Sequence, residues 1–461
     1  MKEVQTKSQS EASRMMIDHF GCPDEFVDLA VRGSLSAASG YFRCGSDTIC
    51  FGQLSSETPA RTVTEPLHDA LHNVTISGSE VLLPFDPAQV VDNLRHERYL
   101  ADHGLGKSTG WAGTLIRELY YLARPFMTVA LRKHLQRFYL HDWKKIPFPH
   151  WPVDCSVENT LEHLLVLSMK AQSVTRIPII WFWPEGAPSC TCVTHDVEAE
   201  AGWDFCSQLM DLDDSFGIKS AFQIVPEERY QISYDRLDSM RERGFEINVH
   251  DLNHDGNLLV DRNDFLLRAS GINDYARKFR AEGFRTAVLY RKIDWFEALH
   301  FAYDLSVPTV AHLEPQRGGC CTVFPFFNGN LLELPVTMAQ DYSLFNILND
   351  YSIDLWKDQA TLIRKKHGLL QMIAHPDYLI DEKARRVYGE LLGYLSDLRA
   401  KGETWIALPA EVNAWWRLRS GLRLVDAAGG WQIQGEGHER ARIAYARIVD
   451  DEITYEFEPS A

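Results

Sequence analysis

The sequence predicts an α/β protein whose largest part is a distorted (β/α) barrel of about seven strands. From about residue 188 onward, short apolar segments alternate with segments of helical pattern. The apolar segments read CTCVTHD, KSAFQIVP, FEINVH, FRTAVLY, NLLELPV, LLQMIAH and TWIALP. Because strands that alternate with helices form parallel sheets, and because this many units can close on themselves, we expect a barrel rather than an open sheet.

Two further regions flank the predicted barrel. Residues 1–150 predict a mixed N-terminal region with short strand-like pieces and few clear helices before about residue 110. A connector, which begins with a segment rich in proline and tryptophan, leads through 151–187 into the barrel at 188–420. The remaining residues, 421–461, contain segments such as DDEITYEFE and predict a small β appendage.

An amphipathic helical stretch at 113–140, interrupted at Pro125, is basic in an acidic chain. Lysine and arginine outnumber acids between residues 113 and 145, whereas the whole chain of 461 residues carries a formal charge of −17. One interpretation is a peripheral helix pair at a membrane surface that meets a lipid-linked substrate. The simpler interpretation is a helix that packs on the next domain and turns a basic face to solvent.

The overall composition disfavours several functions. The charge of −17 argues against nucleic acid as a partner. No apolar run has the length of a transmembrane helix, and the first residues, MKEVQTKSQSEASRMM, lack the apolar core of a secretory signal. We therefore expect a cytoplasmic protein, and the basic stretch at 113–145 allows a place at the inner face of the membrane.

Cysteine usage fits the same compartment. The nine cysteines include no C-x-x-C pair, which is typical of reduced thiols in a cytosolic protein. Cys190 and Cys192 are two residues apart on a predicted strand and therefore share a face. We expect them to pack in the core rather than to bind a metal.

Polar residues gather at the ends of several predicted strands. Asp196 and Glu198 end the first strand, His250 ends the third, and His375 follows a later one. Arg285 lies in the strand segment between the last two. In a parallel barrel the carboxyl ends of the strands meet at one face, where functional groups collect. We therefore expect these side chains to share one site.

Two histidine pairs have the spacing H-x-x-x-H, at His68/His72 and at His250/His254. With 17 histidines in 461 residues, about 0.6 such pairs arise by chance, so the spacing needs a structural context. The first pair has no strand–helix context and predicts a solvated or packed helix pair. The second pair follows a strong strand, and one helical turn would bring both rings to one side, where they could bind a single cation.

Two imidazoles and one carboxylate, with coordination positions left open, are typical of a catalytic metal site. Zinc is the favoured ion, with iron or cobalt as alternatives. In an extended chain residues i and i+2 share a face, so we expect Asp196 and Glu198 to point into the barrel mouth while Val197 packs away. One acid can then bind the metal while the other acts as general base on water.

Four segments together resemble a known family. In chain order they read VTHDVE, FEINVHDLNHDG, GFRTAVLYR and LLQMIAHPDY. They are similar to the motifs of the polysaccharide deacetylases, the NodB-homology enzymes of carbohydrate esterase family four, in the branch with a T-H-D-V-E first motif. The resemblance covers about residues 188–415. It implies a distorted (β/α) barrel and the removal of N-acetyl groups from amino sugars.

The resemblance also implies a role for each matching residue. Asp196 would be the general base, and Arg285 would hold it ionised and oriented. His375 would be the general acid that protonates the leaving amine. One divalent metal ion would be bound by a carboxylate and two imidazoles: Glu198, His250 and His254.

The sequence departs from the common family pattern at three positions. Glu198 stands where Asp is more frequent, His195 replaces an aromatic residue, and Ala287 stands where a proline is usual. We interpret His195 as a packing neighbour rather than a metal ligand, because it alternates with the inward-facing residues. Asp377 could orient His375 or cap the next helix.

Three further residues are candidates for substrate binding: Tyr290, Arg291 and Asp304. Asp304 could equally cap a turn. Taken together, the sequence predicts a metal-dependent hydrolase that removes N-acetyl groups from an amino sugar in a polysaccharide or glycan-precursor pathway. Without an export signal, the expected substrate is a cytoplasmic sugar nucleotide or lipid-linked glycan. Two alternatives stay open: a metal-dependent hydrolase of a non-sugar amide or ureide, and a non-catalytic glycan-binding relative.

Overall fold

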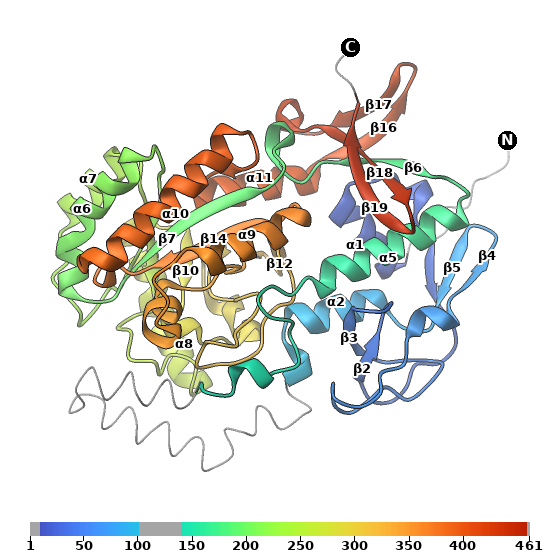
Figure 1. Cartoon of the computed structure of the whole chain (residues 1–461), viewed down its shortest axis with the longest axis horizontal. Helices are drawn as coiled ribbons and strands as arrows, with labels where there is room; N and C mark the ends of the chain where they lie inside the picture. The colour runs from blue at the N-terminus through green and yellow to red at the C-terminus, as the bar shows by residue number, and fades with distance from the viewer. Residues whose placement is uncertain (1–9, 101–139, 459–461) are drawn as a thin grey trace. The chain divides into compact units, whose positions relative to one another are not determined.

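The computed structural model describes residues 10–100 and 140–458, which form two compact units (Figure 1). Of the described residues, the first unit contains three distant stretches, 10–100, 155–186 and 416–458, and the second contains 140–154 and 187–415. The sequence predicts a linear division at 150, 187 and 420 instead, and these domain boundaries stay predictions.

The second unit is built on a curled sheet of parallel strands. Along the sheet they are β14 (Leu369–Ala374), β7 (Cys190–Val197), β8 (Ala221–Ile224), β9 (Glu246–His250), β10 (Gly283–Arg285), β11 (Tyr303–Asp304) and β13 (Leu331–Glu333). Two short strands join it, β12 (Phe326–Asn328) antiparallel to β13 and β15 (Trp405–Ile406) parallel to the start of β7. All eight residues of β7 are buried, as expected for a parallel strand covered on both faces.

An irregular segment closes the gap between the two ends of this sheet. The backbone N–H groups of Thr337 and Met338 both donate to the carbonyl oxygen of Gln371 on β14, at 3.2 and 3.1 Å. On the other side, Val336 pairs with Pro308, which follows β11. The predicted distorted barrel of about seven strands is therefore confirmed, with its last seam made by loop rather than by strand.

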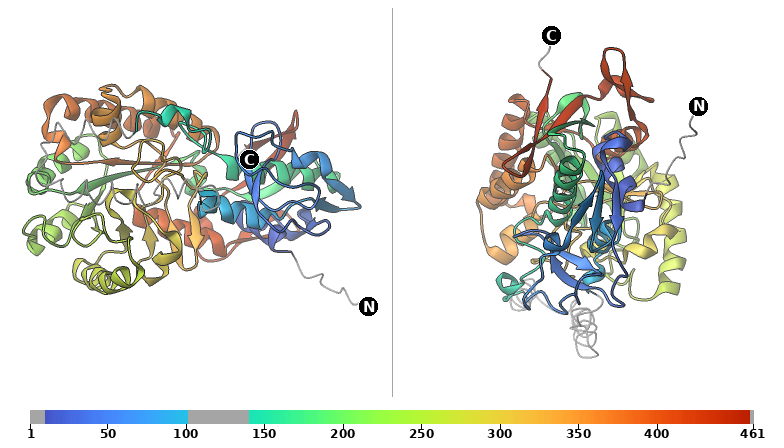
Figure 2. Two further views of the ribbon diagram at one scale, coloured as in Figure 1. Left: turned by 90° about the horizontal axis from the view of Figure 1, so that it is seen from below. Right: turned by 90° about the vertical axis from the view of Figure 1, so that its right-hand side faces the viewer.

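Helices lie outside the curled sheet of the second unit (Figures 1 and 2). Several begin at residues that cap free backbone N–H groups: Ser233 caps α7, Asp261 caps α8 and Asp381 caps α10. The helices are α6 (Glu200–Ser215), α7 (Tyr234–Glu242), α8 (Arg262–Phe279), α9 (Asp354–Lys365), α10 (Glu382–Ala400) and α11 (Pro409–Gly421).

The first unit is a mixed α/β structure that includes the predicted C-terminal β appendage. Strand β6 (Arg176–Ile180), from the segment expected as a connector, pairs with β18 (Ile443–Val449), which pairs with β19 (Glu452–Phe457). Strands β16 (Arg423–Ala427) and β17 (Gly430–Gln434) form a hairpin. The earlier elements are α1 (Glu11–Phe20), β1 (Leu29–Val31), β2 (Gly40–Arg43), β3 (Ile49–Gly52), β4 (Thr75–Ser77), β5 (Glu80–Leu83), α2 (Pro87–Arg95) and α5 (Ser156–Ala171).

The membrane and the cysteines are the subjects of two further predictions. The basic stretch at 113–140 lies outside the described residues except for its last position, so its contact with a membrane stays a prediction. Among the described helices, none has both the length and the apolar character needed to cross a membrane. All nine cysteines are free thiols, and Cys190 and Cys192 are fully buried in the core as expected.

Candidate active site

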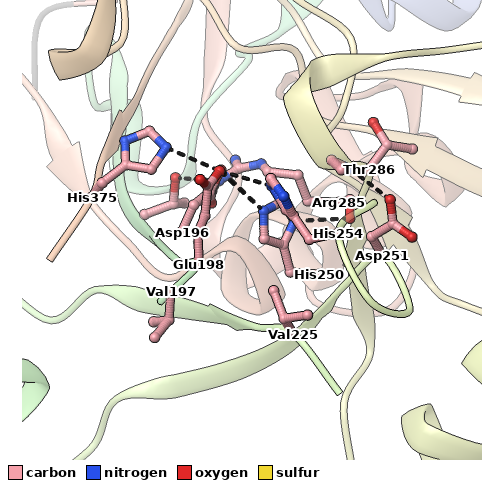
Figure 3. Close-up of polar contacts among 12 residues, drawn as sticks. Asp196, Val197, Glu198, Val225, His250, Asp251, His254, Arg285, Thr286 and His375 are labelled. Atoms are coloured by element: carbon pink, nitrogen blue, oxygen red, sulfur yellow. Dashed lines mark hydrogen bonds and ion pairs between the residues drawn. The ribbon is translucent and has the colours of Figure 1, made fainter. Parts of the chain in front are cut away.

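The carboxyl ends of four barrel strands bring a group of polar side chains together (Figure 3). Asp196 lies near the end of β7, and Glu198 follows that strand directly. His250 ends β9, and His375 follows β14. Figure 3 shows these side chains pointing toward one another, while Val197 points away. The period of two along β7 thus puts both acids on the side of the histidines.

Three of these side chains can hold a metal ion. One ligand atom each from Glu198, His250 and His254 lies within 4.8 Å of the others. Glu198 Oε1 is 2.8 Å from His254 Nε2 and 3.8 Å from His250 Nε2. Ligand atoms that share one zinc ion at about 2.0–2.2 Å lie roughly 3–4 Å from one another, so the separations fit a divalent cation.

The Nε2 atoms of the two histidines, His250 and His254, are buried and form no hydrogen bond within the described part of the chain. The short contact of His254 with Glu198 has the distance of an ion pair but not the alignment of a hydrogen bond. Buried polar atoms without partners in a native protein call for a ligand. Two such nitrogens aimed at one carboxylate therefore favour a cation.

Backbone contacts set the orientation of the His250 ring. Its Nδ1 lies 3.1 Å from the carbonyl oxygen of Arg285. Because a carbonyl only accepts, Nδ1 carries a proton in this contact, and Nε2 is the nitrogen that a metal ion would use. The hydrogen bond that the outer nitrogen makes thus selects the nitrogen offered to a metal.

The segment between the two histidines differs from the expected structure. The sequence predicts one helical turn, and this prediction is wrong, because residues 251–254 form a loop. Asp251 and His254 both have a φ of 55°, in the left-handed region. Asp251 tolerates this conformation because its Oδ1 accepts the N–H of Leu252 at 2.6 Å. Arg229 holds the far end of the loop through the carbonyl oxygens of Asn253 and His254.

Asp196 is buried beside an arginine. The Nη1 atom of Arg285 donates to Asp196 Oδ1 at 2.6 Å and to Thr194 Oγ1 at 2.9 Å. Burial alone would raise the pKa of Asp196, but the positive charge of Arg285 outweighs it, with help from His250, and the pKa is lowered. The second oxygen, Oδ2, lies 3.8 Å from His250 Nε2. Asp196 is therefore an ionised acid with one oxygen turned toward the ligand atoms.

A residue that the sequence did not single out holds His375. Asp341 Oδ1 lies 2.6 Å from His375 Nδ1, and Asp341 Oδ2 accepts the backbone N–H of His375 at 2.7 Å. Burial lowers the pKa of His375, but the carboxylates of Asp341 and Glu198 outweigh burial and raise it well above its usual value. Asp341 follows the strand segment NLLELPV, so the same search of strand ends could have found it.

Glu198 lies between the histidines. Its Oε1 is 3.5 Å from His375 Nε2, on the side opposite His254. Burial raises the pKa of Glu198, but His254, His250 and His375 outweigh it and lower the pKa well below its usual value. Asp341, and not Asp377, orients His375. Asp377 occupies the N-cap position of the next helix, the short 3-10 helix η10 (Tyr378–Ile380), but its side chain makes no capping hydrogen bond there.

Two of the three candidates for substrate binding make internal contacts. Arg291 is buried and donates to the backbone oxygens of Leu289 at 3.0 Å and Arg317 at 3.3 Å. Asp304 is fully buried and accepts from the N–H and the hydroxyl of Ser306, both at 2.8 Å. Tyr290 is partly buried. Internal contacts thus use polar atoms of two of them, and their roles toward substrate stay predictions.

Comparisons with known proteins find distant likenesses among solved structures. No protein-family model matches the sequence, and no curated protein matches it. Solved structures do: a proposed polysaccharide deacetylase from Mycobacterium smegmatis is 18% identical, over 52% of this chain and 93% of that one, with a TM-score of 0.42. A peptidoglycan deacetylase from Bacillus subtilis is 11% identical, over 50% and 94%, with a TM-score of 0.33.

A third similar structure is a family 4 acetyl xylan esterase from Clostridium thermocellum in complex with a cobalt ion. It is 11% identical, over 49% of this chain and 91% of that one, with a TM-score of 0.31. These structures bear the names of the family that the four sequence motifs resemble. Likenesses this distant assign no activity, so the functional assignment depends on the side chains at the strand ends.

Proposed function

We propose that this protein is a metal-dependent hydrolase that removes N-acetyl groups from an amino sugar. One observation carries the proposal: a three-residue ligand group lies between an ionised carboxylate, Asp196, and an imidazole, His375. Hydrolysis of an amide needs an activated water, a Lewis acid for the carbonyl oxygen and an acid for the leaving nitrogen. The group of side chains has a candidate for each need.

Glu198, His250 and His254 would hold the metal ion. Two imidazole nitrogens and one carboxylate oxygen are a set that zinc accepts, and iron or cobalt are alternatives. A divalent cation at this place supplies Lewis-acid chemistry to an amide carbonyl and to water. The three ligands leave coordination positions for substrate and water, as catalytic sites do.

Asp196 would take the proton of the attacking water. Arg285 occupies Oδ1 and keeps the carboxylate ionised, while Oδ2 turns toward the ligand atoms. A base must lie within hydrogen-bond reach of the proton it removes, so the attacking water would have to lie between the ligand group and Oδ2.

His375 would return a proton to the leaving nitrogen. Asp341 binds Nδ1, so Nε2 is the atom that faces the site. The raised pKa of His375, caused by Asp341 and Glu198, keeps the ring protonated near neutral pH and ready to act as an acid. Because the amine is a poor leaving group, this proton is needed for the C–N bond to break.

The sugar substrate is supported by the resemblance of the four motifs and by the names of the similar structures. A cytoplasmic glycan precursor, either a sugar nucleotide or a lipid-linked sugar, stays our preferred substrate class. The presence of a candidate for every catalytic role disfavours the non-catalytic glycan-binding alternative.

The test is a metal-dependent assay of acetate release. The protein is stripped with a chelator, reloaded with zinc, cobalt or iron, and incubated with chito-oligosaccharides, UDP-N-acetylhexosamines and lipid-linked N-acetylated sugars. We expect acetate from at least one class, only with metal present. Hydrolysis of simple amides or ureides without acetate from any sugar would support the non-sugar alternative. A protein that binds glycans, holds no metal and is unaffected by Asp196→Asn would be a binding protein.

A further inference from the structure

A hydrogen-bonded network lies behind the candidate active site, on the helix-covered face of the sheet. Its members are His195, Asp213, Ser220 and Tyr388, and each is fully buried. None of them is a ligand or a catalytic group in the proposed reaction. A polar network in this position replaces what could be apolar packing between strands and helices. Since such networks are costly unless every member is satisfied, their contacts are informative.

Asp213 is the centre of the network. Its Oδ2 lies 3.0 Å from His195 Nε2 and accepts the hydroxyl of Ser220 at 2.6 Å. Its Oδ1 accepts the hydroxyl of Tyr388 at 2.7 Å. The Tyr388 oxygen also lies 3.3 Å from His195 Nε2. Two hydroxyl donors and one imidazole nitrogen therefore meet one buried carboxylate, and both of its oxygens have partners.

His195 makes a second contact through its other nitrogen. Nδ1 lies 3.2 Å from the carbonyl oxygen of Ala374. Because a carbonyl only accepts, Nδ1 is the donor in this bond. The ring also packs on Phe222 at 4.9 Å and against the edge of Tyr388 at 5.8 Å. Both nitrogens of the imidazole thus have partners, and two aromatic rings pack against it.

The network joins the two β/α units that carry the proposed acid and base. Strand β7 leads through Asp196 and Glu198 into α6, which carries Asp213. Strand β14 leads to His375, and α10 further along carries Tyr388. The His195–Ala374 bond links these two units directly behind the site, because Ala374 is the residue before His375. The Asp213–Tyr388 bond links their helices.

We propose that His195 is a positioning residue that sets the place of His375 across the site from Asp196. The role depends on the proposed hydrolase function, since it concerns the distance between an acid and a base. Directional hydrogen bonds restrain the register and separation of two strand ends more narrowly than apolar contacts do. A misplacement of a catalytic group by about 1 Å can cost roughly a hundredfold in rate, so this restraint matters for turnover.

Two substitutions separate the two contacts of His195. In His195→Asn the amide nitrogen lies near the place of Nδ1, so the bond to Ala374 can form while the bond to Asp213 is lost. In His195→Gln the amide nitrogen lies near the place of Nε2, so the bond to Asp213 can form while the bond to Ala374 is lost. We therefore expect His195→Gln to have the lower rate and His195→Asn to have the lower stability.

The expected result is a split between stability and turnover. His195→Gln should lower kcat by at least about tenfold, with KM and metal content unchanged, because the strand end before His375 loses its restraint. His195→Asn should keep kcat within about threefold but show the lower melting temperature, because the buried Asp213 carboxylate loses one of its polar partners. If His195 were purely structural, activity would follow stability, so His195→Asn would be the less active variant. That result would overturn the proposal.

A milder pair of variants covers the case in which neither His195 variant folds. Tyr388→Phe removes one oxygen from the network, and Tyr394→Phe makes the same change on a partly buried residue of the same helix. Tyr388→Phe should lower kcat by about three- to tenfold without a change in KM, whereas Tyr394→Phe should leave both constants as they are. Equal effects of the two variants would contradict the proposal.

A crystallographic measurement keeps this test separate from the test of the function. In the wild type, His375 Nε2 lies 3.5 Å from Glu198 Oε1. Crystal structures of the wild type and of His195→Gln, or of Tyr388→Phe if only that variant folds, should differ in this separation and in the position of Ala374. If the wild type releases no acetate, the proposed function fails but this comparison still applies. An unmoved His375 in the variant would overturn the positioning role alone.

Discussion

The two H-x-x-x-H pairs have the same spacing and opposite surroundings. The side chains of His250 and His254 are 1% and 2% exposed, with ring centroids 4.9 Å apart. Those of His68 and His72 are 20% and 81% exposed. The Nε2 atoms of His250 and His254 are buried, face the Glu198 carboxylate and make no hydrogen bond with a described residue. In the other pair His72 is exposed and His68 is partly buried.

The difference comes from what precedes each pair. His250 ends a parallel strand, so the neighbouring strand end delivers Glu198 to the same edge of the sheet. His68 and His72 lie at a short 3-10 helix, η2 (Ala70–Asn73), and His68 Nε2 bonds the side chain of Asn73 at 2.7 Å. The predicted helix pair is therefore only a single turn. The two histidines are four residues apart in both pairs. Only the pair that follows a parallel strand lies beside a carboxylate from the neighbouring strand end.

The largest effect should come from removing one histidine of each pair. His250→Ala should lose the metal ion and lower kcat/KM by at least about a thousandfold, because one ligand of three is removed. His72→Ala should change neither quantity. Metal analysis by mass spectrometry and acetate release measure both. If the two variants behaved alike, the difference between the two histidine pairs would have no functional meaning.

The next largest effects should distinguish the roles of Asp196 and Glu198, the two acids beside His250 and His254. Asp196→Asn should lower turnover by about 10²- to 10⁴-fold and keep the metal, because it removes a base and not a ligand. Glu198→Gln should release the metal. Metal content and kcat are measured on the same preparations. If Asp196→Asn lost the metal while Glu198→Gln kept it, the roles of the two acids would be exchanged.

A smaller effect is expected from the acid that orients His375. Asp341→Asn should lower kcat by about 10- to 100-fold with little change in metal content, because the amide no longer holds the ring protonated and in place. Single-turnover kinetics and metal analysis check this expectation. Loss of metal in Asp341→Asn would instead show that Asp341 supports the ligand group.

The smallest effect is expected at Asp69, which lies between His68 and His72 in the sequence. Asp69 accepts the backbone N–H groups of Leu71 and Gly45, both at 3.0 Å, so Asp69→Ala should destabilise this turn by about 1 kcal/mol. Hydrogen exchange at these two amides should become faster, while acetate release stays unchanged. A loss of activity in Asp69→Ala would mean that the surface pair contributes to function after all.

Two differences between the sequence predictions and the structure come from the limits of local sequence patterns. The sequence predicts a helical turn between His250 and His254, but the left-handed conformation of Asp251 and His254 makes a loop. The segment expected as a connector contains β6, whose partner β18 lies far along the chain. Local pattern reports the period of an element, and it contains no information about which distant segment will pair with it.

The sequence by itself determined the parallel barrel and the positions of its polar strand ends. Alternating strands and helices specify a parallel sheet, and a parallel sheet gathers its carboxyl ends at one face, so Asp196, Glu198, His250 and His375 could be named in advance. The tertiary structure alone decided the partners behind them. Asp341 meets His375 from 34 residues away, and Asp213 meets Tyr388 from 175 residues away. These contacts form because the barrel curls and closes. Closure depends on packing between residues far apart in the chain, which the hydrophobic periodicity of a short segment cannot predict.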